Sequence, residues 1–470
     1  MFWNEEWTRE VSSEQVALVD KNGTCITYKE LDEVAANLKA TGVKRELVFM
    51  LTENEIGCLG GYYSVMADNM VPLLLDAKLD RALLTKLIET YQPAYLWINQ
   101  KNYQEFPEYS SIFEYEGFGL LKTNFESVPL HEDLAILLTT SGSTGSPKLV
   151  RVSRQNLRCN TNMLAQNAKL TCNDIGITTM PPNYSYGMAI LNMHWCSGAR
   201  MVVTDATVLQ QEFWDLFVEN QVTNLGGVPY TYELLSHYVD FLETDYKHLR
   251  VMTQTGGKLS EQNQKEFTEL FRKQGKELLI WYGQTEASGG LTYLSTERGI
   301  EKLGSIGIPF PGVEVEIISE NPNDVSADAS GELVFKCDSI SMGYALNKED
   351  LSKGDERNHI LYTGDLAKID NDGYLFLLGR INRLIKILGK RISLDEIEVL
   401  LKNQYAGIEC ACKGEDDLLE IYYAGDYKEK EITIFAGKIL GINPRQIVSR
   451  KVDNIPRKES GKIDYGKLKH

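Results

Sequence analysis

Short apolar runs recur between helical patterns in the first part of the chain. They span residues 47–51, 71–75, 94–98 and 134–138. Runs of this length without polar alternation are typical of strands that are buried on both faces of a sheet. Because these strands alternate with helices, the pattern predicts largely parallel, buried sheets in an α/β architecture.

The first helix is marked by its start signal. Thr27-Tyr28-Lys29-Glu30 has the form of a capping box, in which a hydroxyl and a carboxylate each bind the other residue's backbone N–H. Apolar residues follow at helical spacing, at Leu31, Val34, Ala35 and Leu38. We therefore expect an amphipathic helix over residues 27–38.

The pattern changes near residue 300 and again near residue 381. Residues 313–317 and 331–335 alternate as strands do, which predicts a β-rich subdomain over about 300–381. Ser393-Leu394-Asp395-Glu396 then begins a second capped helix, with Ile397, Leu400 and Leu401 on one face. The expected organisation is a large domain over 1–381 and a small α+β domain over 383–470.

Composition and charge narrow the class of protein. The chain has 470 residues, 43% hydrophobic and 24% charged, which is typical of a globular protein with several subdomains. Its net charge of −17 disfavours nucleic acid and anionic membranes as partners. No secretion signal begins the chain and no run approaches the ~18 apolar residues of a membrane span, so we expect a cytoplasmic protein.

Eight cysteines are scattered along the chain without paired C-x-x-C spacing. We expect buried free thiols. Cys410 and Cys412 would point the same way from a strand, but two thiolates without nearby histidines make a poor zinc site, so a metal–thiolate centre is disfavoured.

A loop rich in glycine and hydroxyl groups follows the apolar run at 134–138. It reads Thr139-Thr140-Ser141-Gly142-Ser143-Thr144-Gly145-Ser146-Pro147-Lys148. Such a loop can direct amides, hydroxyls and an ammonium group at a polyphosphate. It is not a Walker loop, because Pro147 stands where that motif has its second glycine. On these residues alone, a flexible surface turn fits as well as a phosphate site.

Four later segments stand in a fixed order with this loop. They are 281–287 (Trp-Tyr-Gly-Gln-Thr-Glu-Ala), 362–365 (Tyr-Thr-Gly-Asp), 379–386 (Gly-Arg-Ile-Asn-Arg-Leu-Ile-Lys) and 456–463 (Pro-Arg-Lys-Glu-Ser-Gly-Lys-Ile). The set closely resembles the adenylate-forming superfamily of acyl- and aryl-CoA synthetases, peptide-synthetase adenylation domains and luciferases. Five motifs in order are specific, although each one alone is weak.

The resemblance implies a two-step reaction that uses ATP and Mg²⁺. In such families a carboxylate attacks the α-phosphate of ATP to give an acyl-adenylate and pyrophosphate. A thiol, usually of CoA or a carrier protein, then displaces AMP. The implied fold is a large N-terminal domain of several subdomains with buried sheets, followed by a small mobile C-terminal domain.

The resemblance also implies roles for individual residues. By position, the phosphate loop comprises Thr140, Ser141, Gly142, Ser143, Thr144, Gly145 and Lys148. Beside it, Tyr282 would stack on adenine next to Gly283, Thr285 would contact phosphate and Glu286 would hold Mg²⁺. Asp365 would bind the ribose hydroxyls and Arg380 the ribose and phosphate. An ordinary ion pair is the alternative for these last two residues.

The resemblance also implies roles for three residues at or after the domain boundary. Lys462 matches the lysine that bridges the attacking carboxylate and the α-phosphate, where it stabilises the charge that builds up. Asn382 stands at the hinge, where relatives commonly have Asp. Gly389 matches the glycine beside the thiol channel, where the absence of a side chain lets the thiol arm pass.

The sequence defines the carboxylic acid substrate less well than the nucleotide site. No Asp lies between Met180 and Asp205 to pair with a substrate ammonium, which disfavours a free α-amino acid. Asn183 and Tyr184 would suit an ortho-hydroxyl aryl acid, but core packing explains these residues equally well. Tyr230, Gly256 and Gly257 are expected to complete the pocket, and its tyrosines favour a small or medium acyl or aryl acid.

Departures from the family pattern leave alternatives open. The second domain is shorter than is common, which puts in doubt the surface that would meet CoA or a carrier protein. The adenylate could also pass to an amine or to oxygen, or an amino acid could be loaded in a biosynthetic pathway. A catalytically silent nucleotide-binding homologue is the alternative of a different class.

Overall fold

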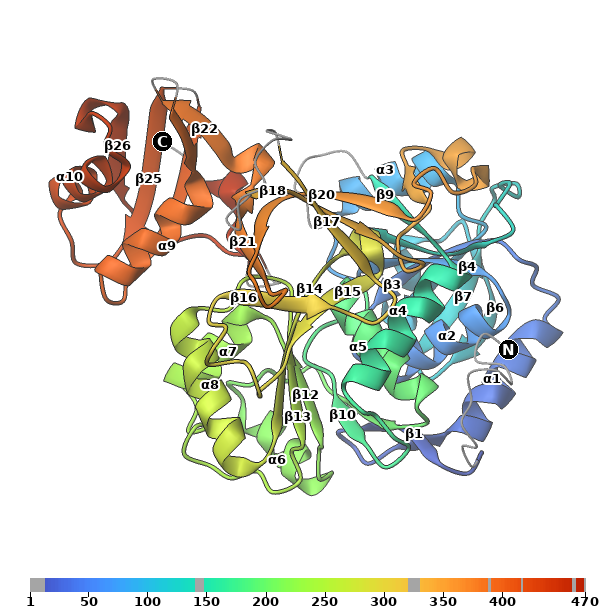
Figure 1. The fold of residues 1–470 in the computed structure, drawn as a ribbon. Helices are drawn as coiled ribbons and strands as arrows, with labels where there is room; N and C mark the ends of the chain where they lie inside the picture. Colours follow the sequence, from blue (N-terminus) through green and yellow to red (C-terminus); the bar gives the residue numbers. More distant parts are fainter. Residues whose placement is uncertain are drawn as a thin grey trace. The chain divides into compact units, whose positions relative to one another are not determined.

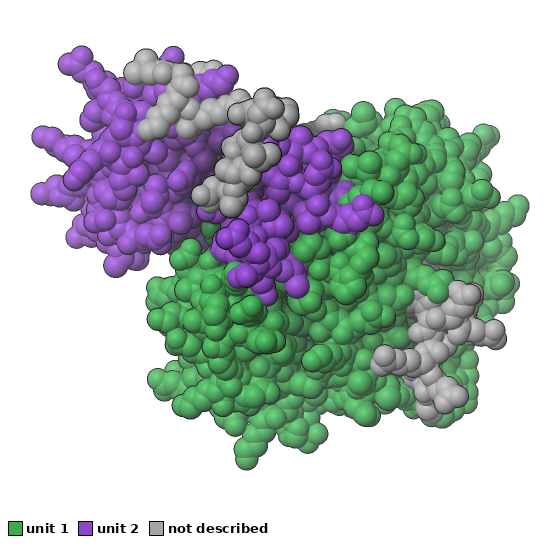
Figure 2. Space-filling model, viewed as in Figure 1, with its two compact units in different colours: residues 1–303, 309–313, 336–361 green, residues 304–308, 314–335, 362–470 purple. Residues whose placement is uncertain are grey.

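The structure, a computed structural model, describes residues 13–139, 148–319, 330–387, 390–415, 417–458 and 462–468. The chain divides into two compact units, which Figure 2 colours green and purple. The first unit comprises residues 1–303, 309–313 and 336–361, and the second comprises 304–308, 314–335 and 362–470. The predicted domain boundary at 381–383 falls within the second unit and stays a prediction.

One sheet of the first unit has eight strands and a parallel centre (Figure 1). In spatial order these are β19 (Gly343–Ala345), β9 (Leu149–Ser153), β8 (Leu134–Thr139), β4 (Val71–Asp76), β3 (Leu47–Thr52), β5 (Tyr95–Asn99), β7 (Phe118–Lys122) and β6 (Ser110–Tyr115). β3 pairs in parallel with β4 and β5, and β4 pairs in parallel with β8. The four apolar runs predicted as strands all lie in this sheet.

The other sheet of the first unit is also parallel at its centre. Its strands are β15 (Gly289–Leu294), β14 (Glu277–Gln284), β13 (Val251–Gln254), β12 (Asn224–Gly227), β10 (Ile175–Ile177), β11 (Arg200–Val203), β1 (Val16–Asp20) and β2 (Cys25–Thr27). The strands from β14 to β1 pair in parallel with their neighbours. β15 and β2 are antiparallel to their partners.

Helices α2 (Ile56–Ala67) and α5 (Ser185–Cys196) are buried on almost every side. α2 contacts β1 of one sheet and β3, β4 and β5 of the other, so it lies between the two layers. Its glycines allow this close approach, because a Cβ at Gly61 would lie 2.1 Å from the Trp97 ring. Helices that are apolar all round are typical of such an interior position.

Helix α1 (Tyr28–Ala40) confirms the predicted cap. The Thr27 hydroxyl accepts from the Glu30 backbone N–H at 3.2 Å, and Glu30 Oε2 accepts from Thr27 N at 2.7 Å. The predicted apolar positions of the helix are buried. The other helices of this unit are α3 (Arg81–Tyr91), α4 (Arg154–Asn167), α6 (Gln211–Glu219), α7 (Pro229–His237) and α8 (Glu261–Gln274), with 3₁₀ turns η1 (Gln100–Glu105), η2 (Thr285–Ala287) and η3 (Lys348–Ser352).

The second unit begins with strands and ends with an α+β layer. Its first strands are β16 (Ser305–Pro309), β17 (Glu314–Ile318), β18 (Ser330–Lys336), β20 (Ile360–Ile369) and β21 (Leu375–Arg380). The rest comprises η4 (Ile381–Arg383), β22 (Leu384–Ile387), β23 (Lys390–Ser393), α9 (Leu394–Gln404), β24 (Glu409–Glu415), β25 (Leu418–Ala424), α10 (Glu429–Leu440), η5 (Pro444–Gln446), β26 (Ile447–Lys451) and η6 (Tyr465–Lys467). α9 packs on β24, and α10 packs on β26.

Helix α9 differs from its prediction in two details. The Ser393 hydroxyl caps it by accepting from Glu396 N at 3.3 Å, and Ile397 and Leu401 are buried as expected. Leu400 is only half-buried, whereas Glu398 is buried. An apolar pattern cannot reveal a buried acid, because its burial depends on partners elsewhere in the chain.

The cysteines are free, and most are buried. Cys25 is exposed, so the expectation of buried thiols is wrong at that position. Cys410 and Cys412 both lie in the core of the α+β layer. Within the described ranges, no helix combines the length and apolar character that crossing a bilayer requires.

Candidate active site

Tyr344 brings together two residues that the sequence assigned to the phosphates and the metal. β19 pairs with β9 so that Tyr344 lies opposite Val150, two residues after Lys148. The Tyr344 hydroxyl donates to Glu286 Oε1 at 2.8 Å. Lys148 Nζ lies 3.3 Å from the centroid of the same ring, a cation–π contact.

The protonation state of Tyr344 suits this role. Burial, followed by the charge of Glu286, raises the pKa of Tyr344 to about 12. The phenol therefore keeps its proton at neutral pH and donates it to the carboxylate. This hydrogen bond orients one oxygen of Glu286.

Two arginines support Tyr344, and the sequence reasoning missed both. Arg151 is fully buried, donates to the Tyr344 carbonyl at 3.1 Å and pairs with Glu356 at 2.5 Å. The Arg357 guanidinium lies 4.7 Å from the Tyr344 ring centroid. The local sequence gives little sign of this cluster, because its contacts depend on the pairing of β9 with β19.

Glu286 lies in η2, directly after β14. Ser341 N donates to the Glu286 carbonyl at 2.9 Å, which holds the turn. A Cβ at Gly283 would lie 1.7 Å from the Gly289 carbonyl oxygen, so only glycine fits at this point of the β14–β15 pairing. On the neighbouring positions, Thr285 Oγ1 lies 3.5 Å from Ser185 Oγ, and the half-buried Tyr282 receives a bond from Gln284 at 3.4 Å.

The residues predicted for the acid pocket are partly brought together. Gly256 has φ +87°, and a Cβ there would lie 2.7 Å from the Tyr184 hydroxyl. A Cβ at Gly257 would lie 3.1 Å from Pro229. Burial raises the pKa of Tyr184 to about 12. Tyr184 therefore packs against the glycine turn as a neutral phenol.

Asn183 and Tyr230 occupy different settings. The Thr52 hydroxyl, at the end of β3, donates to Asn183 Oδ1 at 3.2 Å. Sequence reasoning missed Thr52, because nothing in its local pattern distinguishes it from other strand ends. Tyr230 is exposed on α7.

The second unit places Asp365 beside Arg380. The two residues are direct partners in the β20–β21 pairing, and Arg380 Nε lies 3.2 Å from Asp365 Oδ1. The carboxylate is buried, whereas the guanidinium side chain is 56% exposed. A buried acid with an accessible cation beside it fits both a ribose–phosphate site and a structural ion pair.

The remaining predicted residues lie near the end of the chain or outside the described residues. Lys462 is half-buried, and its carbonyl accepts from Lys458 N at 2.8 Å. Asn382 is exposed in η4. The predicted residues outside the described ranges are Thr140, Ser141, Gly142, Ser143, Thr144, Gly145 and Gly389.

The donor set fits a shared rather than a dedicated metal site. Among the residues that the structure describes, no three His, Cys, Asp or Glu side chains gather where they could hold a metal ion. Glu286 offers one oriented carboxylate, and Mg²⁺ is commonly bound by one or two carboxylates together with substrate phosphates. The residues present therefore fit a Mg²⁺ ion that arrives with ATP.

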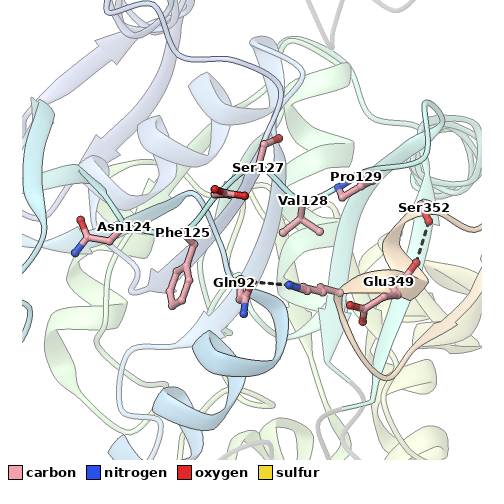
Figure 3. Close-up of a pocket in the computed structure, with 10 residues that line it drawn as sticks. Gln92, Asn124, Phe125, Ser127, Val128, Pro129, Glu349 and Ser352 are labelled. Atoms are coloured by element: carbon pink, nitrogen blue, oxygen red, sulfur yellow. Dashed lines mark hydrogen bonds between the residues drawn. The ribbon is translucent and has the colours of Figure 1, made fainter.

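A separate hollow of about 580 Å³ lies elsewhere in the first unit, and none of the predicted site residues lines it (Figure 3). Lys348 Nζ donates to Gln92 Oε1 at 2.7 Å across it. Glu126 and Glu349 also line the hollow. Lys348 thus already donates to Gln92, and two acids share the lining, which disfavours binding of an anion there.

Two mixed sheets around buried helices, and a tyrosine that contacts both a lysine and a glutamate, agree with the adenylate-forming class that the motifs indicate. The chain belongs to the family of AMP-binding enzymes, whose family model matches residues 5–345. The family recognition and the predicted fold class are confirmed.

Curated relatives cover most of the chain at low identity. Zwittermicin A synthase ZmaJ of Bacillus cereus is 27% identical, over 96% of this chain and 91% of its own length. The 2-succinylbenzoate–CoA ligase of Bacillus cereus (strain Q1) is 26% identical, over 93% and 92%. By contrast, the chain spans 62% of an oxalate–CoA ligase of Saccharomyces cerevisiae and 10% of gramicidin S synthase 2 of Brevibacillus brevis.

Solved structures share the fold over nearly the whole chain. O-succinylbenzoate coenzyme A synthetase (MenE) from Bacillus subtilis, in complex with AMP, matches with a TM-score of 0.78 and 23% identity, covering 100% of this chain and 98% of its own. ATP-bound MatB from Rhodopseudomonas palustris matches with a TM-score of 0.78 and 21% identity, covering 97% and 95%.

Proposed function

We propose that this protein is an AMP-forming acid–thiol ligase. It activates a small or medium carboxylic acid with ATP to an acyl-adenylate and transfers the acyl group to a thiol of CoA or a carrier protein. The observation that carries this proposal is the meeting of Lys148 and Glu286 on Tyr344. A cation and an oriented carboxylate at one point suit a metal-bound pyrophosphate leaving group.

The first unit supplies the groups that bind the nucleotide phosphates. Lys148 and residues 140–145 bind the β- and γ-phosphates, and Thr285 contacts phosphate. Glu286 holds Mg²⁺, which when bound neutralises charge on the phosphate oxygens. The Tyr344 hydroxyl keeps the Glu286 carboxylate in one orientation, and Tyr282 stacks on adenine.

The second unit supplies the ribose contacts and the reacting cation. Asp365 accepts hydrogen bonds from the ribose hydroxyls beside Arg380. Lys462 bridges the attacking carboxylate and the α-phosphate, and it stabilises their charge as the two anions meet. Asn382 is the hinge of the small domain, and Gly389 lines the path of the thiol.

A small or aryl acid is supported by the packing at Gly256. The Tyr184 hydroxyl lies so close to Gly256 that an added Cβ would lie 2.7 Å from it. This close packing leaves little space beside the turn for a large acyl group. Relatives named for oxalate and 2-succinylbenzoate support the same size class. Asn183 and Tyr230 are the further pocket residues.

The test is ATP–pyrophosphate exchange over a panel of short acyl, dicarboxylic, aryl and long-chain acids. We expect exchange with at least one small or aryl acid and little with long chains. Absence of exchange with every acid would refute the proposal and favour a silent nucleotide-binding homologue. For the accepted acid, CoA, a phosphopantetheinylated carrier protein and amines are then compared as acceptors. A cytoplasmic location remains part of the proposal, as does the exclusion of nucleic acid as a partner, which the net charge of −17 supports.

A further inference from the structure

Glu398 is a buried carboxylate at the centre of a polar cluster in the second unit. Glu398 is only 8% exposed. Glu398 Oε1 accepts from Arg383 Nη2 and from Cys412 N, each at 2.7 Å. The Tyr465 hydroxyl lies 3.1 Å from Oε1 and 3.0 Å from Oε2. A buried acid with so many donors is fully partnered, and loss of one donor leaves its charge less compensated.

Arg383 connects this carboxylate to the segment after Asn382. Besides Glu398, it pairs with Asp395 near the start of α9 and donates from Nη1 to the Cys412 carbonyl at 3.4 Å. Its guanidinium also lies 4.1 Å from the centroid of the Tyr465 ring. Tyr465 is thus held at its hydroxyl by Glu398 and over its ring by Arg383.

Tyr465 follows Lys462 by three residues. Residues 462–464 lie beside residues 456–458, because Arg457 forms a β-bridge with Ile463 and Asp464 N donates to the Pro456 carbonyl at 2.8 Å. We call these two described segments the Lys462 turn. Burial, followed by the charge of Glu398, raises the pKa of Tyr465, so its hydroxyl remains a donor. The Lys462 turn is therefore joined to α9 through the protonated Tyr465 phenol, while Ile463 and Tyr465 also pack against β24 and β25.

We propose that Arg383, Glu398 and Tyr465 are positioning residues that fix the Lys462 turn to α9 and to the segment after Asn382. We call these three residues the clasp. Because of the clasp, Lys462 moves together with α9 as one body, and the clasp determines where the Lys462 side chain lies relative to the reacting anions. The proposal rests on the proposed function, since it assumes that Lys462 acts in adenylation.

The test uses Tyr465→Phe in the full-length protein. This change keeps the ring over Arg383 and removes only the donor to Glu398. We expect pyrophosphate exchange to fall about tenfold or more in kcat, because a hydrogen bond to a charged group is lost. Thiol transfer from supplied acyl-adenylate should change less than about twofold. The matched control is Tyr427→Phe, which removes a 2.6 Å bond to the Ala406 carbonyl in the same unit and should leave both steps unchanged.

A double variant separates positioning from general loosening. If Tyr465 acts through Lys462, then Tyr465→Phe should cause no further loss of exchange in a Lys462→Ala background. An equal loss in that background, or equal slowing of both half-reactions, would overturn the proposal.

Amide hydrogen exchange tests the clasp independently of any activity measurement. In Tyr465→Phe, the amides of Asp464 and Lys458 should exchange about tenfold faster than in the wild type or in Tyr427→Phe. Unchanged protection of both amides would overturn the clasp. If the wild-type protein activates no acid while these amides lose protection, the proposed function fails and the clasp stands as a structural joint without a role in adenylation.

Discussion

At the scale of single residues, Tyr344 joins two charged groups through different parts of one side chain. Its hydroxyl donates a hydrogen bond to Glu286, and its ring makes a cation–π contact with Lys148. The two contacts can therefore be separated chemically, since phenylalanine retains the ring and loses the donor. A substitution of Tyr344 therefore tests directly whether Glu286 binds the metal ion.

We predict that Tyr344→Phe raises the Mg²⁺ concentration needed for half-maximal pyrophosphate exchange by about tenfold. The reason is that Glu286 loses the hydrogen bond that orients it, and bonds to charged groups contribute roughly 1.5–3 kcal/mol. Exchange measured against Mg²⁺ at fixed ATP checks this. Tyr238→Phe, at a position 75% exposed, is the control. An unchanged Mg²⁺ profile would count against the role of Glu286.

At the scale of elements, the buried helix α5 carries a histidine that must stay neutral. Burial lowers the pKa of His194 to about 4 from 6.5. Its Nδ1 contacts the Ile190 carbonyl at 2.8 Å, whereas Nε2 has no partner among the described residues. Helix packing thus determines the charge state of this residue.

His194 should make stability fall with acidity. Between pH 6.5 and about 4 the unfolded chain binds a proton that the folded chain does not, so stability rises with pH across this window. The loss on acidification to about pH 4 amounts to about 3 kcal/mol. Urea denaturation from pH 4 to 7 checks this against His194→Gln, in which that part of the slope should vanish. Exposed His248→Gln should keep the wild-type slope.

The capping box of α1 makes a second prediction at this scale. Thr27→Ala removes the hydroxyl that accepts from Glu30 N, which should lower the free energy of unfolding by about 1 kcal/mol. Thermal or urea denaturation measures the change. Thr85→Ala, at an exposed position of α3, should stay within about 0.5 kcal/mol of the wild type. Equal effects at both positions would contradict the assignment of the cap.

At the scale of the whole molecule, the proposed residues are divided between two units. Lys148, Glu286 and Tyr344 belong to the first unit, whereas Asp365 and Lys462 belong to the second. The proposed adenylation step needs both units. The two half-reactions can therefore respond differently to a change in one of them.

We predict that Lys462→Ala lowers adenylate formation by about 10²-fold, because the developing charge loses its cation. Transfer from supplied acyl-adenylate should be nearly unchanged. Pyrophosphate exchange and thioester formation measure the two steps separately. Lys467→Ala, whose side chain is 72% exposed, is the matched control. Equal loss in both steps would refute the assigned role.

Local patterns anticipated the elements better than the contacts between them. The apolar runs at 47–51 and 71–75 are β3 and β4, because a strand buried on both faces must be apolar throughout. Glu398 shows the limit of this reasoning. Its place between Ile397 and Val399 gives no sign of burial, since Arg383 and Tyr465, which make burial tolerable, lie far along the chain.

By itself the sequence determined the α/β class, four strands of the eight-stranded sheet, the start of α1 and membership of the family, because periodicity, caps and ordered motifs can be read along the chain. Only the tertiary structure decided that Tyr344 joins Lys148 to Glu286 and that Tyr465 joins the Lys462 turn to α9. These contacts depend on strand register and on partnered buried charges, which join residues far apart in the chain.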